Sequence, residues 1–454
     1  MYGKIKRIHF VGIGGIGMSG IAEVLINMGY EISGSDIGQS STVKRLKDLG
    51  ANITIGHRAE NVKGSGVVVT SSAIRPDNPE VLGAKELNIP VIPRAEMLAE
   101  LMRLRYGIAV AGSHGKTTTT SMVAAVLSYG KLDPTIVVGG KVTAMGTNAR
   151  LGRGDFMVVE ADESDGSFLR LSPVISVLTN IDEEHMDHYK DMDELESAFS
   201  TFINKIPFYG LSVLCLDCPR TKKLSKDFRK RFLTYGFDKE AELRAQNVTI
   251  SGFETKFDVF LNDEELGSVT LNVPGYHNAQ NALAAIAVGM ELGMSFENTS
   301  KGLSEFRGID RRLQIKGEGR GIRVIDDYAH HPREIEVTLS AVKESHSGRV
   351  VVIFQPHRYS RTKLLFDEFA RVLVDTDMLY IMDIYAASED PISGVSSESL
   401  SKAVIEKGGK NVRHLNGDDM VSTVLGELKE NDVVITLGAG NVWAFGEKIV
   451  EELR

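Results

Sequence analysis

Cysteine is almost absent from the 454-residue chain, which contains only Cys215 and Cys218. A framework of several disulfides is therefore excluded as the basis of its stability. The pair forms a Cys-x-x-Cys motif that closes an apolar stretch, residues 211–216, and runs into Pro219, whereas a redox pair would open a helix. A zinc site needs two further ligands at suitable spacing. We expect two structural thiols.

Long apolar runs are also absent. The basic first seven residues are followed by an apolar stretch that glycines interrupt from Gly12 onward, so neither a signal sequence nor a membrane span is predicted. This favours a cytoplasmic protein without membrane insertion. Acidic residues outnumber basic ones by 61 to 52, and the net charge of −9 argues against binding to nucleic acid. The length suggests about three domains.

The first part of the chain, residues 1–105, alternates apolar stretches with helical patterns across glycine-containing turns. This alternation is typical of a parallel sheet covered by helices. The expected strands are 8–13, 31–35 and 67–70, and the expected helices are 21–28, 43–49 and 79–87.

The first of these turns reads Gly-x-Gly-x-x-Gly over residues 12–17, and Asp36 ends the second expected strand. This spacing is the Rossmann fingerprint, in which a diphosphate meets a helix N-terminus and a carboxylate meets a ribose or base. NAD and a nucleotide-linked sugar both present these groups, so both remain open. The candidate ligand-binding residues, including those after the expected strand 67–70, are Gly14, Gly15, Ile16, Gly17, Asp36, Ser71, Ser72 and Arg75.

A second phosphate-binding pattern opens the central part of the chain, between the apolar stretch 108–111 and a helical pattern at 121–127. It is a shortened Gly-x-x-Gly-Lys-Thr loop, because Val110 stands where the usual P-loop has its first glycine. Lys116 would meet the β- and γ-phosphates of ATP, and the Thr117 hydroxyl would ligate Mg²⁺. The candidate nucleotide-binding residues are Gly112, Ser113, His114, Gly115, Lys116, Thr117 and Thr118.

Acidic and histidine residues follow two apolar stretches, 156–159 and 174–178, in the same central part. Carboxylates at strand ends beside a phosphate loop supply the oxygen ligands that a nucleotide's Mg²⁺ requires. Glu160 is the predicted metal ligand, and His185 is a second candidate. The amide of Asn281, which precedes an alanine-rich helical pattern, is predicted to reach an adenine or a phosphate.

A third α/β pattern occupies the end of the chain, with strands expected at 323–325, 350–354, 378–383 and 433–437. Polar loops follow three of them, where ligands of such folds bind. Arg358 and Arg361 are spaced to clamp a phosphate or carboxylate. His330 has a side chain suited to accept a proton from an amine near neutral pH.

Taken together, these motifs resemble the Mur ligases of peptidoglycan synthesis, and within them the alanine-adding branch. The match follows chain order over nearly the whole sequence. It is carried by residues 12–20, 112–118, 160–165, 179–180 with 185–187, 277–278 with 281–282, 311–312, 326–332 and 355–362.

The resemblance implies an α/β protein of three domains. A Rossmann-like domain, residues 1–105, would bind UDP-N-acetylmuramate. A central P-loop ATPase-like, mononucleotide-binding domain, residues 106–311, would hold ATP and Mg²⁺. A C-terminal Rossmann-like domain, residues 312–454, would take L-alanine. It further implies that Arg312 touches the γ-phosphate, that Asp327 meets the ribose, and that Tyr328, His330, Arg358 and Arg361 orient the two substrates.

The implied reaction joins L-alanine to the lactoyl carboxylate through an acyl phosphate, with Lys116 and arginines stabilising the transferring charge. The expected protein is a monomer or a weak homodimer. Three alternatives remain: an NAD-dependent dehydrogenase, the murein-tripeptide-recycling ligase of the same family, and a nucleotide sensor without turnover. The dehydrogenase explains the first glycine turn but gives Lys116 no task.

Overall fold

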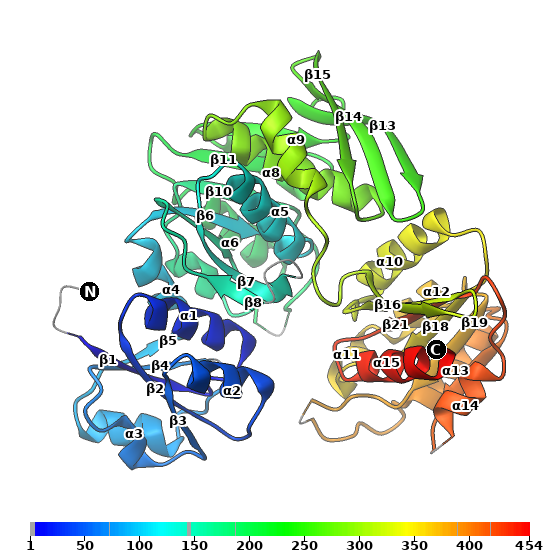
Figure 1. The fold of residues 1–454 in the computed structure, drawn as a ribbon, viewed down its shortest axis with the longest axis horizontal. Coiled ribbons are helices and arrows are strands. Elements are labelled where there is room, and N and C mark those ends of the chain that lie inside the picture. Colours follow the sequence, from blue (N-terminus) through cyan, green and yellow to red (C-terminus); the bar gives the residue numbers. More distant parts are fainter. Residues whose placement is uncertain (1–4, 72, 143–146, 187, 388, 418) are drawn as a thin grey trace. The chain divides into compact units, whose positions relative to one another are not determined.

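A computed structural model describes residues 5–71, 73–142, 147–186, 188–387, 389–417 and 419–454. Its strands form three sheets, each accompanied by helices (Figure 1). The chain divides into two compact units, and each is described here by itself. Unit 1 comprises Met1–Val248, Lys256–Thr270 and Ala279–Phe306, and unit 2 comprises Thr249–Thr255, Leu271–Asn278 and Arg307–Arg454. The predicted α/β class is confirmed, whereas the three-domain boundaries stay a prediction.

The first sheet of unit 1 is entirely parallel, in the order β3-β2-β1-β4-β5. Its strands are β1 (Arg7–Val11), β2 (Glu31–Asp36), β3 (Asn52–Ile55), β4 (Val67–Thr70) and β5 (Val91–Pro93). Its helices are α1 (Ile16–Asn27), α2 (Ser41–Asp48), the 3₁₀ turn η1 (Ala59–Val62), α3 (Pro79–Glu86) and α4 (Arg94–Met102).

Helix α1 begins at Ile16, five residues before the predicted start at residue 21. The sequence pattern misses this first turn because its small residues carry no apolar periodicity. The reason for a small residue is visible at Gly20, where an added Cβ would lie 3.1 Å from the Ala149 side chain and 3.2 Å from that of Asn148. Close approach, rather than hydrophobic patterning, fixes the residue type here.

The second sheet, most of which belongs to unit 1, has the order β15-β14-β13-β12-β11-β10-β6-β9-β7-β8. Strand β6 lies between the parallel strands β10 and β9, so the loops after these three strands share one edge. The strands are β6 (Tyr106–Ala111), β7 (Thr135–Val142), β8 (Thr147–Arg150), β9 (Phe156–Glu160), β10 (Ile175–Leu178), β11 (Leu211–Cys215), β12 (Phe232–Gly236), β13 (Leu243–Ser251), β14 (Glu254–Leu261) and β15 (Glu264–Leu271). The accompanying helices are α5 (Lys116–Tyr129), η2 (Ser167–Arg170), α6 (Met192–Ile203), α7 (Pro219–Asp227), α8 (Tyr276–Glu291) and α9 (Phe296–Ser304).

The sheet of unit 2 has the order β16-β17-β21-β18-β19-β20 and is parallel except for β16. Helices α10, α12 and α13 bury their apolar residues against one face, and α14 and α15 cover the other. The strands are β16 (Gln314–Gly319), β17 (Ile322–Asp327), β18 (Val350–Phe354), β19 (Met378–Met382), β20 (Val412–Leu415) and β21 (Val433–Leu437). The helices are α10 (Pro332–Ser345), α11 (Tyr359–Leu364), α12 (Phe366–Val372), α13 (Ser397–Glu406), α14 (Met420–Leu425) and α15 (Val442–Leu453).

The two cysteines are free thiols, and Cys215 is buried within β11. Among the described residues, no helix has both the length and the apolar character needed to cross a membrane. Instead, apolar surface is used inside the units. In unit 1, the ring of Phe168 stacks on Phe202 at 5.2 Å and meets Phe199 edge-on at 5.4 Å, and all three side chains are buried.

We expect Phe202→Ala to destabilise unit 1 by about 3–5 kcal/mol, because a ring-sized cavity would open among buried aromatic side chains. The midpoint of urea unfolding, followed by circular dichroism, measures the effect. Phe208→Ala is the matched control, because Phe208 is 87% exposed and its loss should change stability by less than about 0.5 kcal/mol. Equal shifts for the two variants would contradict this account of the core.

Candidate functional site

The first glycine turn joins β1 to α1 and is held by the end of β2. The backbone N–H groups of Gly12 and Ile13 both donate to the Ser35 carbonyl at 2.9 Å. The N–H of Gly14 donates to Asp36 Oδ2 at 2.8 Å, and a Cβ added to Gly14 would lie 2.8 Å from that oxygen. The structure thus brings the predicted turn and Asp36 together, with a helix N-terminus beside them.

This turn lies where the strand order reverses, because β1 is flanked by β2 on one side and β4 on the other. Ligands of open α/β sheets bind at such a switch point. The loop after β4 reaches the turn, since the Ile74 side chain lies 3.3 Å from the position of a Gly12 Cβ. Ser71 follows β4 directly, whereas the predicted Ser72 lies outside the described residues.

Two arginines near this turn differ from the sequence expectation. The side chain of Arg75 is 83% exposed and pairs with Asp77 at 3.1 Å. Arg94, which the sequence analysis missed, begins α4 and lies against Gly17, where its Nη1 is 2.6 Å from the position of an added Cβ. The available signal was its place directly after β5, at the carboxyl edge of the same sheet.

The phosphate loop joins β6 to α5 and requires glycine at two positions. Gly112 has φ +136° and Gly115 has φ +78°, a left-handed conformation that L side chains rarely adopt. Helix α5 begins at Lys116, whose Nζ turns back to donate to the carbonyls of Gly112 at 2.6 Å and Ser113 at 3.0 Å. The cation is therefore held inside the loop, where a phosphate would be cradled.

Carboxylates from the end of β9 surround this cation. Glu160 accepts from the Thr117 hydroxyl at 2.9 Å and from the Gly139 N–H at 2.6 Å. Glu163 pairs with Lys116 Nζ at 2.8 Å, although its side chain is only 1% exposed. Burial raises the pKa of Glu163 to about 7 despite the opposing charge of Lys116. Its other oxygen, Oε2, is buried and has no hydrogen-bond partner among the described residues.

His185, on the loop after β10, faces this carboxylate. Its Nε2 lies 3.6 Å from Glu163 Oε1 and 3.8 Å from Glu184 Oε2, and its φ of +59° marks a strained backbone. The ligand atoms of these three side chains lie within 4.8 Å of one another. The carboxylates of this group, the nearby Thr117 hydroxyl and the Glu163 Oε2 atom that lacks a hydrogen-bond partner in the described part of the chain are oxygen ligands of the kind that a divalent cation such as Mg²⁺ prefers.

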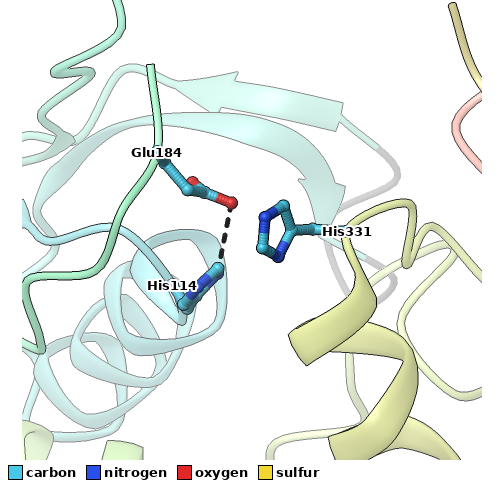
Figure 2. A group of neighbouring side chains, drawn as sticks. All are labelled: His114, Glu184 and His331. Carbon is cyan, nitrogen blue, oxygen red and sulfur yellow. Dashed lines mark ion pairs between the residues drawn. The ribbon is translucent and has the colours of Figure 1, made fainter. Parts of the chain in front are cut away.

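The loop histidine is held by the segment after β10. The His114 ring lies between acidic side chains, with Nε2 3.2 Å from Asp182 Oδ2 and Nδ1 3.7 Å from Glu184 Oε1. Figure 2 shows the ion pair between His114 and Glu184. Its backbone N–H donates to Asn180 Oδ1 at 2.8 Å. The third side chain drawn in Figure 2, His331, belongs to unit 2, where it caps α10.

Helix α8 contributes the predicted amide. Asn281 Oδ1 accepts from the Thr119 hydroxyl at 3.1 Å and lies 2.8 Å from the position of a Gly115 Cβ. Asn281 therefore contacts the first turn of α5, the helix that begins at the phosphate loop. Ser113 and Thr118 lie in the same loop and first turn, and the Ser113 hydroxyl donates to the Asp182 carbonyl at 3.2 Å.

In unit 2, the loops after β17 and β18 bring aromatic and basic side chains together. The His330 ring lies 5.3 Å from Tyr328 and 6.1 Å from His357. Burial lowers the pKa of His330, while Glu334, 3.3 Å away, opposes that shift. With Nδ1 3.0 Å from the Tyr328 carbonyl, the neutral ring leaves Nε2 as an acceptor.

The other predicted residues of unit 2 differ in burial and in their partners. Asp327 is 3% exposed and accepts backbone N–H groups from Leu313 and Ala329, each at 2.8 Å. Arg312 pairs with Glu334 at 3.5 Å. Arg358 is exposed, with φ +69° at the start of α11.

Arg361 lies in the same part of unit 2, with Nη1 3.4 Å from His357 Nδ1. Burial first, and then the charge of Arg361, lower the pKa of His357 to about 4. The imidazole is therefore neutral beside the guanidinium. Arg361, His357 and His330 form one connected group, whereas Asp327 is occupied by backbone amides.

Comparison with protein families gives three matches in chain order. They are the Mur ligase family, catalytic domain, over residues 7–106; the Mur ligase middle domain over 110–289; and the Mur ligase, glutamate ligase domain over 311–440.

Full-length relatives agree. The chain is 56% identical over 455 residues to the UDP-N-acetylmuramate–L-alanine ligase of Geotalea uraniireducens, covering 100% of this chain and 99% of that protein. It is 57% identical over 452 residues to the enzyme of the same name from Desulfatibacillum aliphaticivorans, covering 99% of each.

Solved structures are also similar to this chain. UDP-N-acetylmuramate-alanine ligase from Thermotoga maritima has a TM-score of 0.84 at 31% identity, with 98% of each chain covered. A murein peptide ligase from Psychrobacter arcticus has a TM-score of 0.73 at 23% identity, with 99% of this chain and 98% of that chain covered, which supports the fold alone.

We expect Gly112→Ala to abolish binding of Mg-ADP, because an added Cβ would lie 2.0 Å from Thr179 Oγ1 and 3.0 Å from the Asn180 backbone. Calorimetric titration with Mg-ADP measures the loss. The control is Gly29→Ala, which has φ +88° but nothing within 4 Å. It adds backbone strain of about 1 kcal/mol without a collision and should leave nucleotide affinity unchanged. Normal binding by Gly112→Ala would contradict the role given to this loop.

Proposed function

The chain belongs to the Mur ligase family, and from this premise we propose that it joins L-alanine to the lactoyl carboxylate of UDP-N-acetylmuramate in peptidoglycan synthesis. It is an ATP-dependent carboxylate–amine ligase. The observation that carries this proposal is the pair of phosphate-binding turns in unit 1, after β1 and after β6. One protein then accommodates a nucleotide-linked sugar and ATP at separate loops.

The rival functions leave features without a task. A dehydrogenase accounts for the turn at Gly12 but not for Lys116 and its surrounding carboxylates. A sensor without turnover gives no role to the neutral imidazole of His330. The tripeptide-recycling ligase shares the fold, but the two relatives at 56% and 57% identity carry the L-alanine name.

The chemistry addresses an inert carboxylate. Its oxygen attacks the γ-phosphorus of ATP, ADP leaves, and an acyl phosphate results. The unprotonated amine of L-alanine then attacks the acyl carbon, the C–O bond to phosphate breaks, and the amine proton passes to a base. The products are the amide, ADP and phosphate.

Residues of unit 1 are assigned to the first step. Lys116 stabilises the charge that develops on the transferring phosphoryl oxygens. Thr117, Glu160 and His185 would hold Mg²⁺, which neutralises phosphate charge when bound. Gly112, Ser113, His114, Gly115 and Thr118 complete the phosphate loop, and Asn281 is assigned to the adenine.

The uridine-linked sugar is assigned to the first sheet. Gly14, Gly15, Ile16 and Gly17 would receive its diphosphate at the N-terminus of α1, and Asp36 would contact the ribose or base. Ser71, Ser72 and Arg75 remain assigned to the same substrate by sequence position.

Residues of unit 2 are assigned to the second step. His330 accepts the amine proton at Nε2, and Tyr328, Arg358 and Arg361 orient the carboxylates of the substrates. Arg312 and Asp327 remain assigned to the γ-phosphate and the ribose of ATP. The proposed organisation is three domains, 1–105, 106–311 and 312–454, in a cytoplasmic monomer or weak homodimer.

Phosphate release tests the proposal. With ATP, Mg²⁺ and UDP-N-acetylmuramate present, we expect release to require an amino acid and to be fastest with L-alanine. Lys116→Ala is expected to abolish release while UDP binding persists, because the first glycine turn is untouched. Release that ignores the amino acid would indicate a simple ATPase, and fastest release with murein tripeptide would indicate the recycling ligase.

For His330→Ala we expect kcat/KM to fall about 10²–10⁴-fold near neutral pH, the range of general base catalysis. Burial lowers the pKa of His330 below the usual histidine value near 6.5, so the wild-type imidazole is neutral at neutral pH. Activity should therefore decline only at a pH lower than 6.5, where the imidazole takes up a proton. The loss in the variant should partly recover at high pH, where the amine deprotonates unaided.

The control is His346→Ala, at the opposite end of α10 from His330, which should keep the wild-type pH profile. A loss for His330→Ala that is equal at every pH would assign this residue to positioning rather than to proton transfer.

A further inference from the structure

We propose that Arg94 receives the diphosphate of the uridine-linked substrate and that Asp162 is an internal competitor for the same guanidinium. Binding of the substrate would then break an ion pair with the loop that carries Glu160 and Glu163. The inference rests on the proposed function, because that function supplies the diphosphate.

Arg94 lies directly across the N-terminal turn of α1. A Cβ added to Gly17 would be 2.6 Å from Arg94 Nη1, 3.0 Å from its Cδ and 3.1 Å from its Cζ. The space left by the missing side chain of Gly17, the third glycine of the fingerprint, is thus filled by the Arg94 guanidinium at the helix end. The first backbone N–H groups of a helix lack partners within the helix and favour anions.

The placement of Arg94 also follows from topology. It is the first residue after β5, and β5 pairs in parallel with β4 beside β1. The side chain thus starts from the same sheet edge as the turn at Gly12. A guanidinium and a helix N-terminus that meet at a switch point form a recognised combination for binding phosphate.

Asp162 occupies this guanidinium in the structure. Its Oδ2 lies 3.2 Å from Arg94 Nη2, and the two side chains are 42% and 23% exposed, respectively. Its other oxygen accepts the Ser164 N–H at 3.1 Å, which fixes the carboxylate on its loop. A bound diphosphate would repel this aspartate, so the two anions compete for the guanidinium.

The position of Asp162 links the two ligand loops. It follows β9 between Glu160, which contacts Thr117, and Glu163, which pairs with Lys116. When the diphosphate takes Arg94, the loop that holds the phosphate-loop cation loses its attachment to α4 at this point. The diphosphate of the sugar substrate must therefore displace Asp162 from Arg94 before both loops carry their ligands.

Calorimetric titration of the full-length chain with UDP tests the competition, because two substitutions must change affinity in opposite directions. Arg94→Met should raise the Kd of UDP about tenfold or more, the effect of losing a charge-assisted hydrogen bond. Asp162→Asn should lower the Kd about two- to fivefold, the worth of a partly exposed ion pair. In the double variant, Asp162→Asn should have no further effect, since the contested guanidinium is gone.

The matched control is Glu96→Gln, which removes the neighbouring ion pair between α4 and η2, Glu96–Arg170 at 3.1 Å, and should leave the Kd unchanged. An equal tightening by Glu96→Gln would assign the effect to the packing of α4 and overturn the role of Asp162. An unchanged Kd in Arg94→Met overturns the inference while the proposed function stands. A wild-type chain that binds no UDP overturns both.

Discussion

The ion pair between Lys116 and Glu163 is the interaction on which the nucleotide loop depends. A largely buried ammonium needs a close counter-charge, and Glu163 provides one to Lys116 at 2.8 Å, where the two side chains are 1% and 14% exposed, respectively. The carbonyls of Gly112 and Ser113 accept the remaining protons of Nζ. Burial raises the pKa of Glu163 to about 7, because the charged carboxylate is poorly solvated there. The ion pair with Lys116 therefore forms at the cost of desolvating the Glu163 carboxylate. A phosphate, with several charged oxygens, is a stronger partner for the same cation.

The geometry of parallel sheets is the constraint that organises the rest of unit 1. Parallel strands carry their following loops to one edge of a sheet, and the helix that begins there presents unpaired N–H groups. Glycine is favoured where the backbone takes a left-handed conformation, as at Gly12 and Gly115, and the Arg94 side chain fills the space beside Gly17. Two such edges in one unit explain why two different nucleotides can be accommodated by one chain.

The sequence predicts this arrangement where residue type is dictated by backbone geometry. The glycines of both turns, Lys116 and the central strands belong to that class, and the structure places them as expected. It does not predict contacts that depend on how separate elements pack. Arg94 has no motif of its own, and it reaches Gly17 only because β5 lies on the outer side of β4. Similarly, the antiparallel edge strand β16 was missed, because the short sequence around it lacks a clear alternation of apolar residues.

The alanine methyl group offers little free energy for selecting the amino acid. An apolar pocket distinguishes a methyl group by only about 1–3 kcal/mol, so glycine and L-serine cannot be rejected strongly on size. An α-carboxylate is a larger signal, because a guanidinium binds it with a charge-assisted hydrogen bond. Arg361, which we propose for this role, has a neutral neighbour at 3.4 Å, since burial first and then the guanidinium itself lower the pKa of His357 to about 4. Because His357 is neutral, the positive charge of this pair lies on Arg361. A guanidinium in this position would favour an amine that carries a carboxylate over an amine that lacks one.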